Sequence, residues 1–565
     1  MSVASDSAVA QVGDVASCRQ WLEAMPDEVA PRLAAIGALL ARLGRARIGA
    51  DPLFEMLELV RVEQVRAIDR WLTPLADRAV PYADDEWQRV GSALASLRAS
   101  RDLFKRAHSL MLGRDGERST IAGATDALRV VMPLARALDA QARLVSLLLR
   151  HRSAPLVADW DALCVLARHT RRTTFQDETL LDEVPLVKPV TARALFVYPL
   201  LLLGAALSSR PVAEAGIAER LAGRLAAKVG FRIDEHARES NPHGPTLLLT
   251  PRYAVRLDTH RLPASIERRR LQVRGAGSPS GRSMPLSEGA VDALLADLEQ
   301  RWTGAVCADS RGVQAAPGAG APSHCAGSAR LRLGLPRMHA ADLKAVEQSQ
   351  APVPGSDTRY LYGGWEQNTI VQLMLGGQGQ RDEPAVRAMA EAETVGGVES
   401  RPGDRLVVER HGPTRRVLLG GLVAIAPDAG LRLGTIESIE QIPDVDYLRL
   451  RGHRLVVRCW PGQPVPAGVR IDAALSFADA WLLPGDPAAG ELPSLVLAPG
   501  RARVGARALL RERDRDAPVR FASLIERGPG YERVSLRSDS QLATAASTPG
   551  SQPGAAQAVY GNSRR

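Results

Sequence analysis

The front half of the chain places apolar residues at the spacing of amphipathic helices. Trp87, Val90, Leu94 and Leu97 follow one another at steps of three and four, and Gly113 is expected to end this helix. Similar spacing recurs in Phe54–Leu72, Asp126–Arg150, Trp160–His169 and Ile217–Leu225. We therefore predict a helical domain over residues 14–232.

The pattern changes after residue 232. Thr246–Thr250 and Tyr253–Leu257 are short runs typical of strands, and Ala290–Trp302 then returns to helical spacing. Residues 233–309 are thus predicted to form a mixed connecting segment. Residues 310–328 are rich in Ala, Gly, Pro and Ser, a composition that predicts a flexible linker.

The rear half consists of short apolar runs separated by Gly and Pro, which is typical of a barrel or sandwich. The strands predicted for a barrel over residues 329–465 are Arg330–Leu335, Leu361–Leu375, Arg405–Val408, Val417–Ile425, Leu431–Ile439, Tyr447–Leu450 and Leu455–Cys459. Those predicted for a small terminal β unit over residues 466–540 are Ser494–Leu497, Arg507–Leu510, Val519–Ile525 and Tyr531–Leu536. Residues 541–565 are predicted to be a disordered tail. The predicted fold class is therefore α+β and multidomain, with a helical N-terminal half and an antiparallel β-barrel in the C-terminal half.

Composition adds little to this picture. The chain has 565 residues and 45% hydrophobic residues, enough for three or four packed domains at about 100–200 residues each. Its formal net charge is +9, but nearly all of the positive charge is Arg, and acidic residues are interspersed with it. No basic stripe interleaved with aromatic residues is present, so the sequence disfavours nucleic-acid binding.

The cysteines and the N-terminus indicate a cytoplasmic protein. The five cysteines are odd in number and widely scattered, which argues against a disulfide framework. Residues 1–20 lack a basic segment followed by an apolar run, so no signal peptide is predicted. The longest apolar run, Ala194–Leu207, is 14 residues long and too short for a bilayer span of about 20 residues, so a buried helix is predicted instead.

Motifs for catalysis or metal binding are not recognisable. The sequence has no CxxC, HExxH or GxSxG motif, and no Gly-rich loop that ends in Lys-Ser or Lys-Thr. Cys307, His324 and Cys325 lie in or near the linker, where adjacent ligands would lack a rigid support for zinc. We therefore expect no enzyme activity and no metal cofactor, although a catalytic site assembled from distant residues stays open.

Two kinds of charged cluster remain. The acidic pairs Asp84-Asp85 and Asp182-Glu183 are predicted to be solvated helix caps. Arg270 and Arg274 form an RxxxR pattern, and two Arg forks four residues apart can bracket a phosphate or a guanine edge. A solvated helix face is the alternative for these arginines.

Several segments together resemble a family of proteobacterial proteins with a helical N-terminal region followed by a PilZ-like β-barrel. Members are described as cyclic di-GMP-binding or PilZ-domain proteins. The segments that carry this resemblance are Phe54–Leu72, Thr191–Ala206, Tyr362–Leu375, Leu418–Gly434 and Pro493–Leu536. The resemblance implies a barrel whose entrance holds the guanines and phosphates of the nucleotide.

This chain departs from both motifs that the family uses for the nucleotide. Where the resemblance places an RxxxR switch, the chain has Arg330, Arg332 and Arg337. The D/N-x-S-x-x-G motif falls at Asn368, with Ile370 in place of Ser and Leu373 in place of Gly. Ile cannot donate the hydroxyl hydrogen bond, and Leu blocks a close approach of the backbone. We therefore expect weak binding of cyclic di-GMP, with Arg330, Arg332, Arg337 and Asn368 as its candidate contacts.

The leading hypothesis is a nonenzymatic regulator or adaptor with a PilZ-like barrel, whose helical region contacts a protein partner. The main alternative is a scaffold or chaperone-like interaction module that binds no nucleotide. A nucleic-acid-binding protein and an enzyme with a dispersed site are the remaining hypotheses.

Overall fold

A computed structural model describes most of the chain, in two compact units. The described residues are 12–75, 78, 80–115, 124–171, 176–235, 244–275, 286–304, 329–333, 393–401, 404–411, 416–426, 431–472, 474, 477–485, 491–512 and 515–538. The first unit takes in the described residues up to Ala326 together with those of Val407–Leu419 and Glu437–Val456. The second takes in those of Gly327–Leu406, Gly420–Ile436 and Val457–Arg565.

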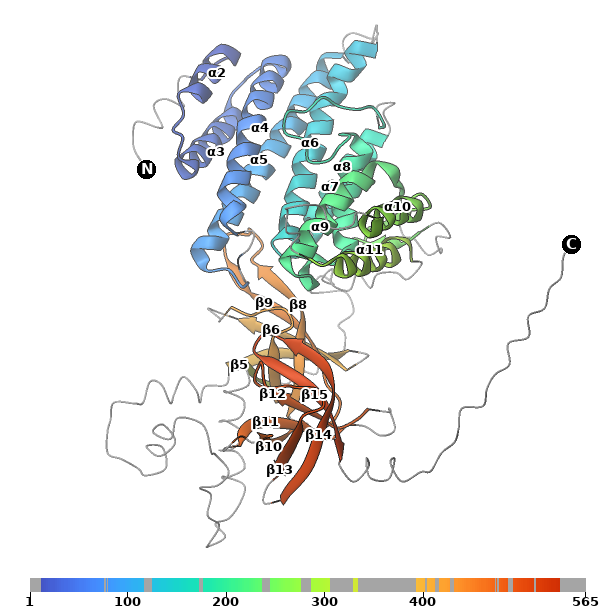
Figure 1. Cartoon of the computed structure of the whole chain (residues 1–565). Coiled ribbons are helices and arrows are strands. Elements are labelled where there is room, and N and C mark those ends of the chain that lie inside the picture. The colour runs from blue at the N-terminus through green and yellow to red at the C-terminus, as the bar shows by residue number, and fades with distance from the viewer. Residues whose placement is uncertain are drawn as a thin grey trace, which may run out of the picture. The chain divides into compact units, whose positions relative to one another are not determined.

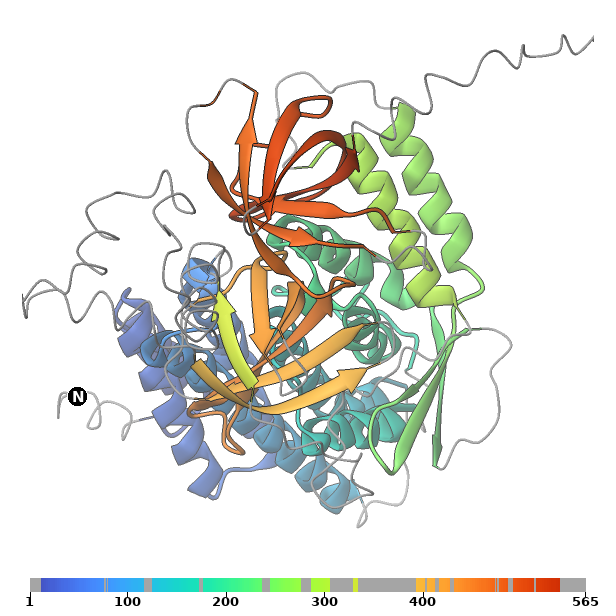
Figure 2. The same cartoon turned by 90° about the horizontal axis from the view of Figure 1, so that it is seen from below.

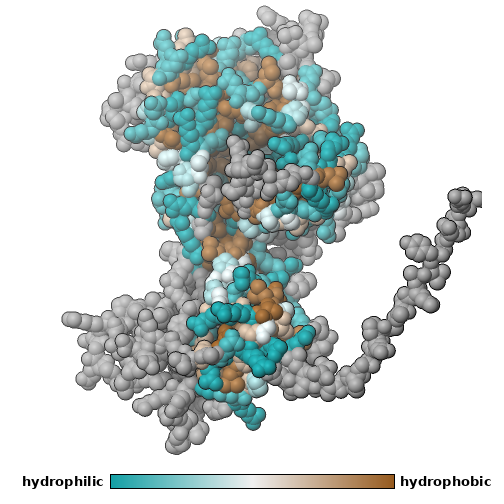
Figure 3. Space-filling view, viewed as in Figure 1, coloured by the Kyte–Doolittle hydropathy of each residue, from teal (hydrophilic) through white to brown (hydrophobic). Residues whose placement is uncertain are grey.

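Long helices make up most of the first unit, as predicted. They are α2 (Val15–Glu23), α3 (Val29–Arg45), α4 (Ala50–Leu72), α5 (Asp84–Asp115), α6 (Ala124–Arg150), α7 (Val157–Arg171), α8 (Ala192–Gly204) and α9 (Val212–Leu225). Short 3-10 turns follow at Thr73–Leu75, Leu207–Ser209 and Ala226–Lys228. The helices α3 to α6 lie side by side, and each packs against its neighbour in the chain (Figure 1). The face of these helices in Figure 3 is mostly hydrophilic, with hydrophobic residues in smaller patches.

The apolar stripes read from the sequence form the helical core. On α5, Trp87, Val90, Leu94 and Leu97 are all buried. The segment Ala192–Ser209, which contains α8, is long and apolar enough to cross a bilayer, yet 67% of it is buried inside the protein. The predicted buried helix is therefore confirmed.

A small sheet and two further helices follow in the described part of this unit. The strands β1 (Gly230–Glu235), β2 (Thr246–Leu248) and β3 (Tyr253–Asp258) pair antiparallel in the order β1-β3-β2. They are followed by α10 (Leu262–Gly275) and α11 (Glu288–Thr303), which lie against each other (Figure 2). The sequence predicted α11 but not α10, since only Leu262 and Ile266 of α10 are buried and a stripe of two residues gives no helical signal.

The turn between β8 (Arg432–Pro443) and β9 (Leu450–Cys459) belongs to the first unit and inserts Tyr447 among the helices. The Tyr447 side chain is fully buried. Its hydroxyl donates a hydrogen bond to the carboxylate of Asp159 on α7 and accepts one from the backbone N–H of Leu156 at 2.9 Å. The guanidinium of Arg98 on α5 lies over the Tyr447 ring, 4.6 Å from its centroid, and pairs with Asp159 at 3.0 Å.

The backbone of this turn lies directly on α5. The indole N–H of Trp87 donates to the Tyr447 carbonyl oxygen at 3.0 Å. Gly91, one helical turn further along, lies so close that an added Cβ would be 2.6 Å from the same oxygen. A larger residue at Gly91 would therefore push the turn away from α5. Tyr447 itself has φ of +61°, and the predicted strand Tyr447–Leu450 is wrong except for its last residue, because the strand β9 begins only at Leu450.

A second connection uses Gln441 near the end of β8. Its side-chain amide donates to the carbonyl oxygen of His151 at 2.7 Å and accepts from the backbone N–H of Tyr82 at 2.9 Å. Its own backbone N–H donates to the Arg152 carbonyl oxygen at 2.6 Å. Both polar ends of this buried side chain are thus satisfied by segments that flank α5 and α6.

The rear half contains two closed six-stranded barrels. The first, in the order β4-β5-β6-β9-β8-β7, is built from β4 (Ala329–Leu333), β5 (Glu393–Arg401), β6 (Arg405–His411), β7 (Leu422–Ala426), β8 and β9. The second, in the order β10-β11-β12-β15-β14-β13, is built from β10 (Val465–Ile471), β11 (Ala478–Leu483), β12 (Ser494–Leu497), β13 (Arg507–Glu512), β14 (Arg515–Gly528) and β15 (Tyr531–Ser538). The α+β class and the C-terminal antiparallel barrel are confirmed. The terminal β unit predicted over residues 466–540 has six strands instead of the four predicted, and they close into a barrel of their own.

The second barrel, coloured dark orange to red in Figure 2, is filled by apolar side chains that point inward from its strands. Its interior is filled by the alternate apolar residues of all six strands, including Val469, Leu495 and Phe521, each fully buried. The outward-facing Trp481 and Val496 pack with Leu422 and Leu433 of the first barrel in a separate apolar core. The sequence did not predict β5, β10 and β11. Gly397 interrupts β5 and Pro466 interrupts β10, while β11 is a short run that Asp479 interrupts.

Three predicted segments lie outside the described residues: the strand Leu361–Leu375, the linker 310–328 and the tail 541–565.

The Tyr447 hydroxyl should contribute measurably to the stability of the first unit. We expect Tyr447→Phe to lower the free energy of unfolding by about 1–3 kcal/mol, because a buried carboxylate loses its donor and a backbone N–H loses its acceptor. Urea unfolding followed by fluorescence measures this change. The matched control is Tyr253→Phe, a buried tyrosine whose hydroxyl has no hydrogen bond to another described residue. Equal stability of the two variants would contradict the assignment.

Candidate functional site

Two of the four predicted ligand contacts lie in the described part of the chain. Arg330 and Arg332 are on β4, where Arg330 pairs with Thr394 of β5 and Ala426 of β7, and Arg332 pairs with Ala424. Leu331 between them is buried. Arg337 and Asn368 lie outside the described residues. The structure thus places two arginines two positions apart on one strand of the first barrel.

The RxxxR pair of the sequence contacts a carboxylate. Arg270 and Arg274, one turn apart on α10, both reach Asp292 on α11, at 2.9 Å from Arg270 Nε to Oδ1 and 2.9 Å from Arg274 Nη2 to Oδ2. Hydrogen bonds from these two guanidinium groups lower the pKa of Asp292 to about 2. The two forks bracket an anion as expected of this spacing, but that anion belongs to the protein.

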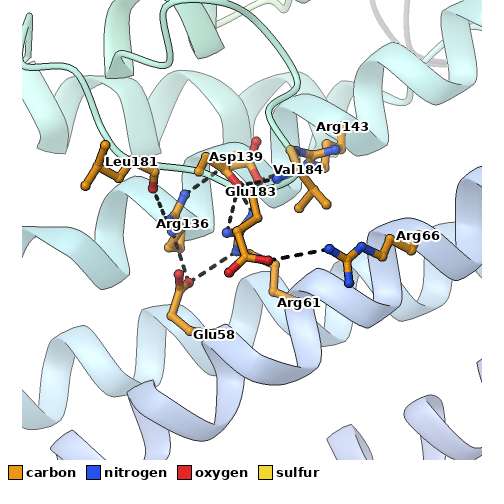
Figure 4. A network of polar contacts seen from close by, with 10 residues as sticks. Glu58, Arg61, Arg66, Arg136, Asp139, Arg143, Leu181, Glu183 and Val184 are labelled. Carbon is orange, nitrogen blue, oxygen red and sulfur yellow. Dashed lines mark hydrogen bonds and ion pairs between the residues drawn. The ribbon is translucent and has the colours of Figure 1, made fainter. Parts of the chain in front are cut away.

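The most extensive charged cluster lies inside the helical unit and is drawn in Figure 4. Its centre is Asp182, whose side chain is 0% exposed. Arg61 on α4 donates to both of its oxygens, at 2.9 and 3.2 Å, and Arg136 on α6 donates to Oδ2 at 3.0 Å. The backbone N–H of Val184 donates to Oδ1 at 2.9 Å. These bonds to the charged form lower the pKa of Asp182 despite the burial that opposes ionisation.

Neighbouring groups complete the network around Asp182. Arg143 on α6 pairs with Asp139 at 2.9 Å and also donates to the carbonyl oxygen of Val184. Arg136 pairs with Glu58 on α4 at 3.0 Å and donates to the carbonyl oxygen of Leu181 at 3.0 Å (Figure 4). The network therefore ties the loop around residue 182 to α4 and α6.

The two acidic pairs were both predicted to be solvated helix caps. This is right for Asp84-Asp85 and wrong for Asp182. Asp84 and Asp85 are exposed in the first turn of α5, where negative charge is favourable. Asp182 is instead a buried counter-ion for two arginines, and Glu183 pairs with Arg66 at 3.5 Å. The sequence gives no local signal for this difference, because the partners of Asp182 lie 46 and 121 residues away.

Chemically reactive groups are held in unreactive states in the described residues. Cys18, Cys164 and Cys459 are buried and free. Burial raises the pKa of the Cys18 and Cys459 thiols to about 11 and that of Cys164 to about 12. No group of three or more His, Cys, Asp or Glu side chains that could hold a metal ion occurs within the described part of the chain. Cys307, His324 and Cys325 lie outside it.

The second barrel carries an arginine and aromatic cluster that sequence reasoning missed. Phe477 lies against Gly468 of β10, with the guanidinium groups of Arg511 and Arg470 at 4.0 and 5.2 Å from its ring centroid. Arg511 also makes a two-pronged ion pair with Asp516, at 2.6 and 2.8 Å. The only sequence signal was the alternation of β13, which places Arg507, Leu509 and Arg511 on one face.

Comparisons with known proteins gave no match: no family model, no curated protein and no solved structure is significantly similar to this chain.

The charged network predicts that the Asp182 carboxylate contributes strongly to the stability of the helical unit. We expect Asp182→Asn to lower the free energy of unfolding by about 3–5 kcal/mol, because it leaves buried arginines without their counter-ion. The matched control is Asp177→Asn in the same loop, where Asp177 is 61% exposed and pairs with Arg193. An exposed pair is worth about 0–1 kcal/mol, so this control should be nearly neutral. Urea unfolding of both variants measures the two changes. Similar losses in the free energy of unfolding would contradict the role of Asp182 as a buried counter-ion.

A pH dependence should come from His151. Burial, and then the charge of Arg150, lowers its pKa to about 4, while its Nδ1 lies 2.9 Å from the Tyr82 hydroxyl. Since unfolded histidine titrates at about 6.5, the unfolded state gains a proton first, so this contribution is full above that pH and is lost as the pH falls toward the folded pKa. We expect urea unfolding at about pH 7.5 and about pH 5 to show a smaller loss of stability in His151→Gln than in the parent. An equal loss of stability in His151→Gln and in the parent would contradict this role of His151.

Proposed function

We propose that this chain is a nonenzymatic regulatory or adaptor protein, in which a PilZ-like barrel senses a nucleotide and the helical unit contacts a protein partner. The single observation that supports it best is the first barrel, a closed six-stranded barrel whose strand β4 carries Arg330 and Arg332. Arginine suits a phosphate-containing ligand, because its planar fork matches phosphate and can also stack on guanine.

The proposed ligand is cyclic di-GMP, and its affinity is expected to be weak. Asn368 fits the motif that the resemblance implies, whereas Ile370 and Leu373 replace the Ser and Gly of that motif. The ligand contacts we propose are Arg330, Arg332, Arg337 and Asn368. Arg270 and Arg274 are left out of the site because both are engaged by Asp292.

A scaffold or chaperone-like protein that binds no nucleotide is the second candidate. It is favoured by the way the helical unit is cross-linked internally, with the Tyr447 turn and the Asp182 network fixing its helices. A rigid platform of this kind suits the presentation of a binding surface, since little conformational freedom is lost on binding.

Isothermal titration with cyclic di-GMP tests the proposal. We expect weak binding by the parent and a loss of about tenfold or more in Arg330→Ala, Arg332→Ala or Arg337→Ala, because a charged hydrogen bond is worth about 1.5–3 kcal/mol. The matched control is Arg274→Ala, which removes an arginine that pairs with Asp292 and should leave the affinity unchanged.

Each other outcome has a distinct meaning. Tight binding by the parent would refute the weak site. Unchanged binding in all three barrel variants would remove these arginines from the site. A parent that binds no cyclic di-GMP at all would favour the scaffold.

A further inference from the structure

Three arginines lie in a row across the outer face of the second barrel. Arg507 of β13 is the antiparallel partner of Arg520 of β14, and Arg520 is in turn the partner of Arg537 of β15. We call Arg507, Arg520 and Arg537 the arginine row. Neighbouring residues on the same strands, Val519 and Phe521, fill the barrel interior, so the register that aligns the three arginines is fixed by the core.

In the absence of a bound anion, the arginine row destabilises the fold. Like charges directly opposite each other on adjacent strands destabilise a sheet. Arg507 and Arg537 are exposed, whereas Arg520, between them, is partly buried, and its Nε atom is buried with no hydrogen-bond partner in the described residues. A buried donor without an acceptor adds a desolvation cost to the repulsion.

Two other arginines of the same barrel are neutralised locally. Arg511 pairs with Asp516, and Arg527 pairs with Glu532 at 2.8 Å. No carboxylate of the described chain pairs with any member of the arginine row. The row is therefore the part of this barrel where an external anion would remove a repulsion that the protein leaves in place.

The spacing indicates what kind of anion fits. Adjacent strands are about 4.8 Å apart, so the row spans about 10 Å and offers two neighbouring gaps between guanidinium groups. Each gap can take one phosphoryl group between two guanidinium groups. A guanidinium group can donate two parallel hydrogen bonds to two oxygens of one phosphate. A single phosphate would fill only one of the two gaps.

We propose that the arginine row is a binding site for a diphosphate group. The site lies on the second barrel and uses none of the residues proposed for cyclic di-GMP on β4. Arg520 is its central residue, because it borders both gaps and carries the donor that lacks a partner.

Titration of the full chain with inorganic pyrophosphate, at constant ionic strength, tests this site. We expect saturable binding to the parent, weaker binding of orthophosphate, and an affinity for pyrophosphate at least about tenfold lower in Arg520→Gln, since a charged hydrogen bond at both gaps is lost. Arg507→Gln, at an exposed end of the row, should weaken binding less than Arg520→Gln. The matched control is Arg501→Gln, an equal change of charge at an exposed position in the β12–β13 connection.

Thermal unfolding gives a second readout that also reports whether each variant folds. Without added anion, Arg520→Gln should melt at or above the temperature of the parent, because the central like charge is gone. Pyrophosphate should raise the melting temperature of the parent and of Arg501→Gln, but much less that of Arg520→Gln.

The proposal is overturned if pyrophosphate does not bind, if Arg520→Gln and Arg501→Gln lose affinity equally, or if orthophosphate binds as tightly as pyrophosphate. Arg330→Ala and Arg332→Ala should keep the parent's affinity for pyrophosphate. A failure of the cyclic di-GMP site is therefore distinguishable from a failure of the arginine row.

Discussion

Tyr447 joins three parts of the helical unit at one buried point: its hydroxyl bonds to Asp159 of α7, its ring and carbonyl oxygen contact Arg98 and Trp87 of α5, and its backbone belongs to the turn between β8 and β9. The surrounding packing depends on this contact, because Gly91 leaves room for the turn and Trp87 fixes its carbonyl oxygen. A tyrosine can do this where a phenylalanine cannot, since it fills an apolar space and also ends in a donor and acceptor.

Arginine has opposite roles in the two halves of the protein. In the helical unit, the arginines around Asp182 and Asp292 are matched by carboxylates and act as structural cross-links. On the second barrel, the arginine row has no such match among the described residues. The net charge of +9 therefore says little about partners, because what matters is which arginines have a counter-ion within the protein.

The helices and several strands could be predicted because their signals are local. The stripe Trp87, Val90, Leu94 and Leu97 carries the helical period, and Ser494–Leu497 is a short apolar run typical of a buried strand. The candidate sites could not be predicted in the same way. Asp182 differs from an ordinary cap only through arginines far away in the sequence, and the arginine row exists only through the pairing register of three strands. Such information is absent from any short window of sequence.

The Tyr447 contact also has a consequence during synthesis. Its partner Asp159 leaves the ribosome 288 residues earlier. At about 5–20 residues per second, α7 therefore waits roughly 15–60 s before the residue that completes its surroundings is made. During this interval the Trp87 indole N–H and the Asp159 carboxylate lack the hydrogen bonds that Tyr447 later supplies.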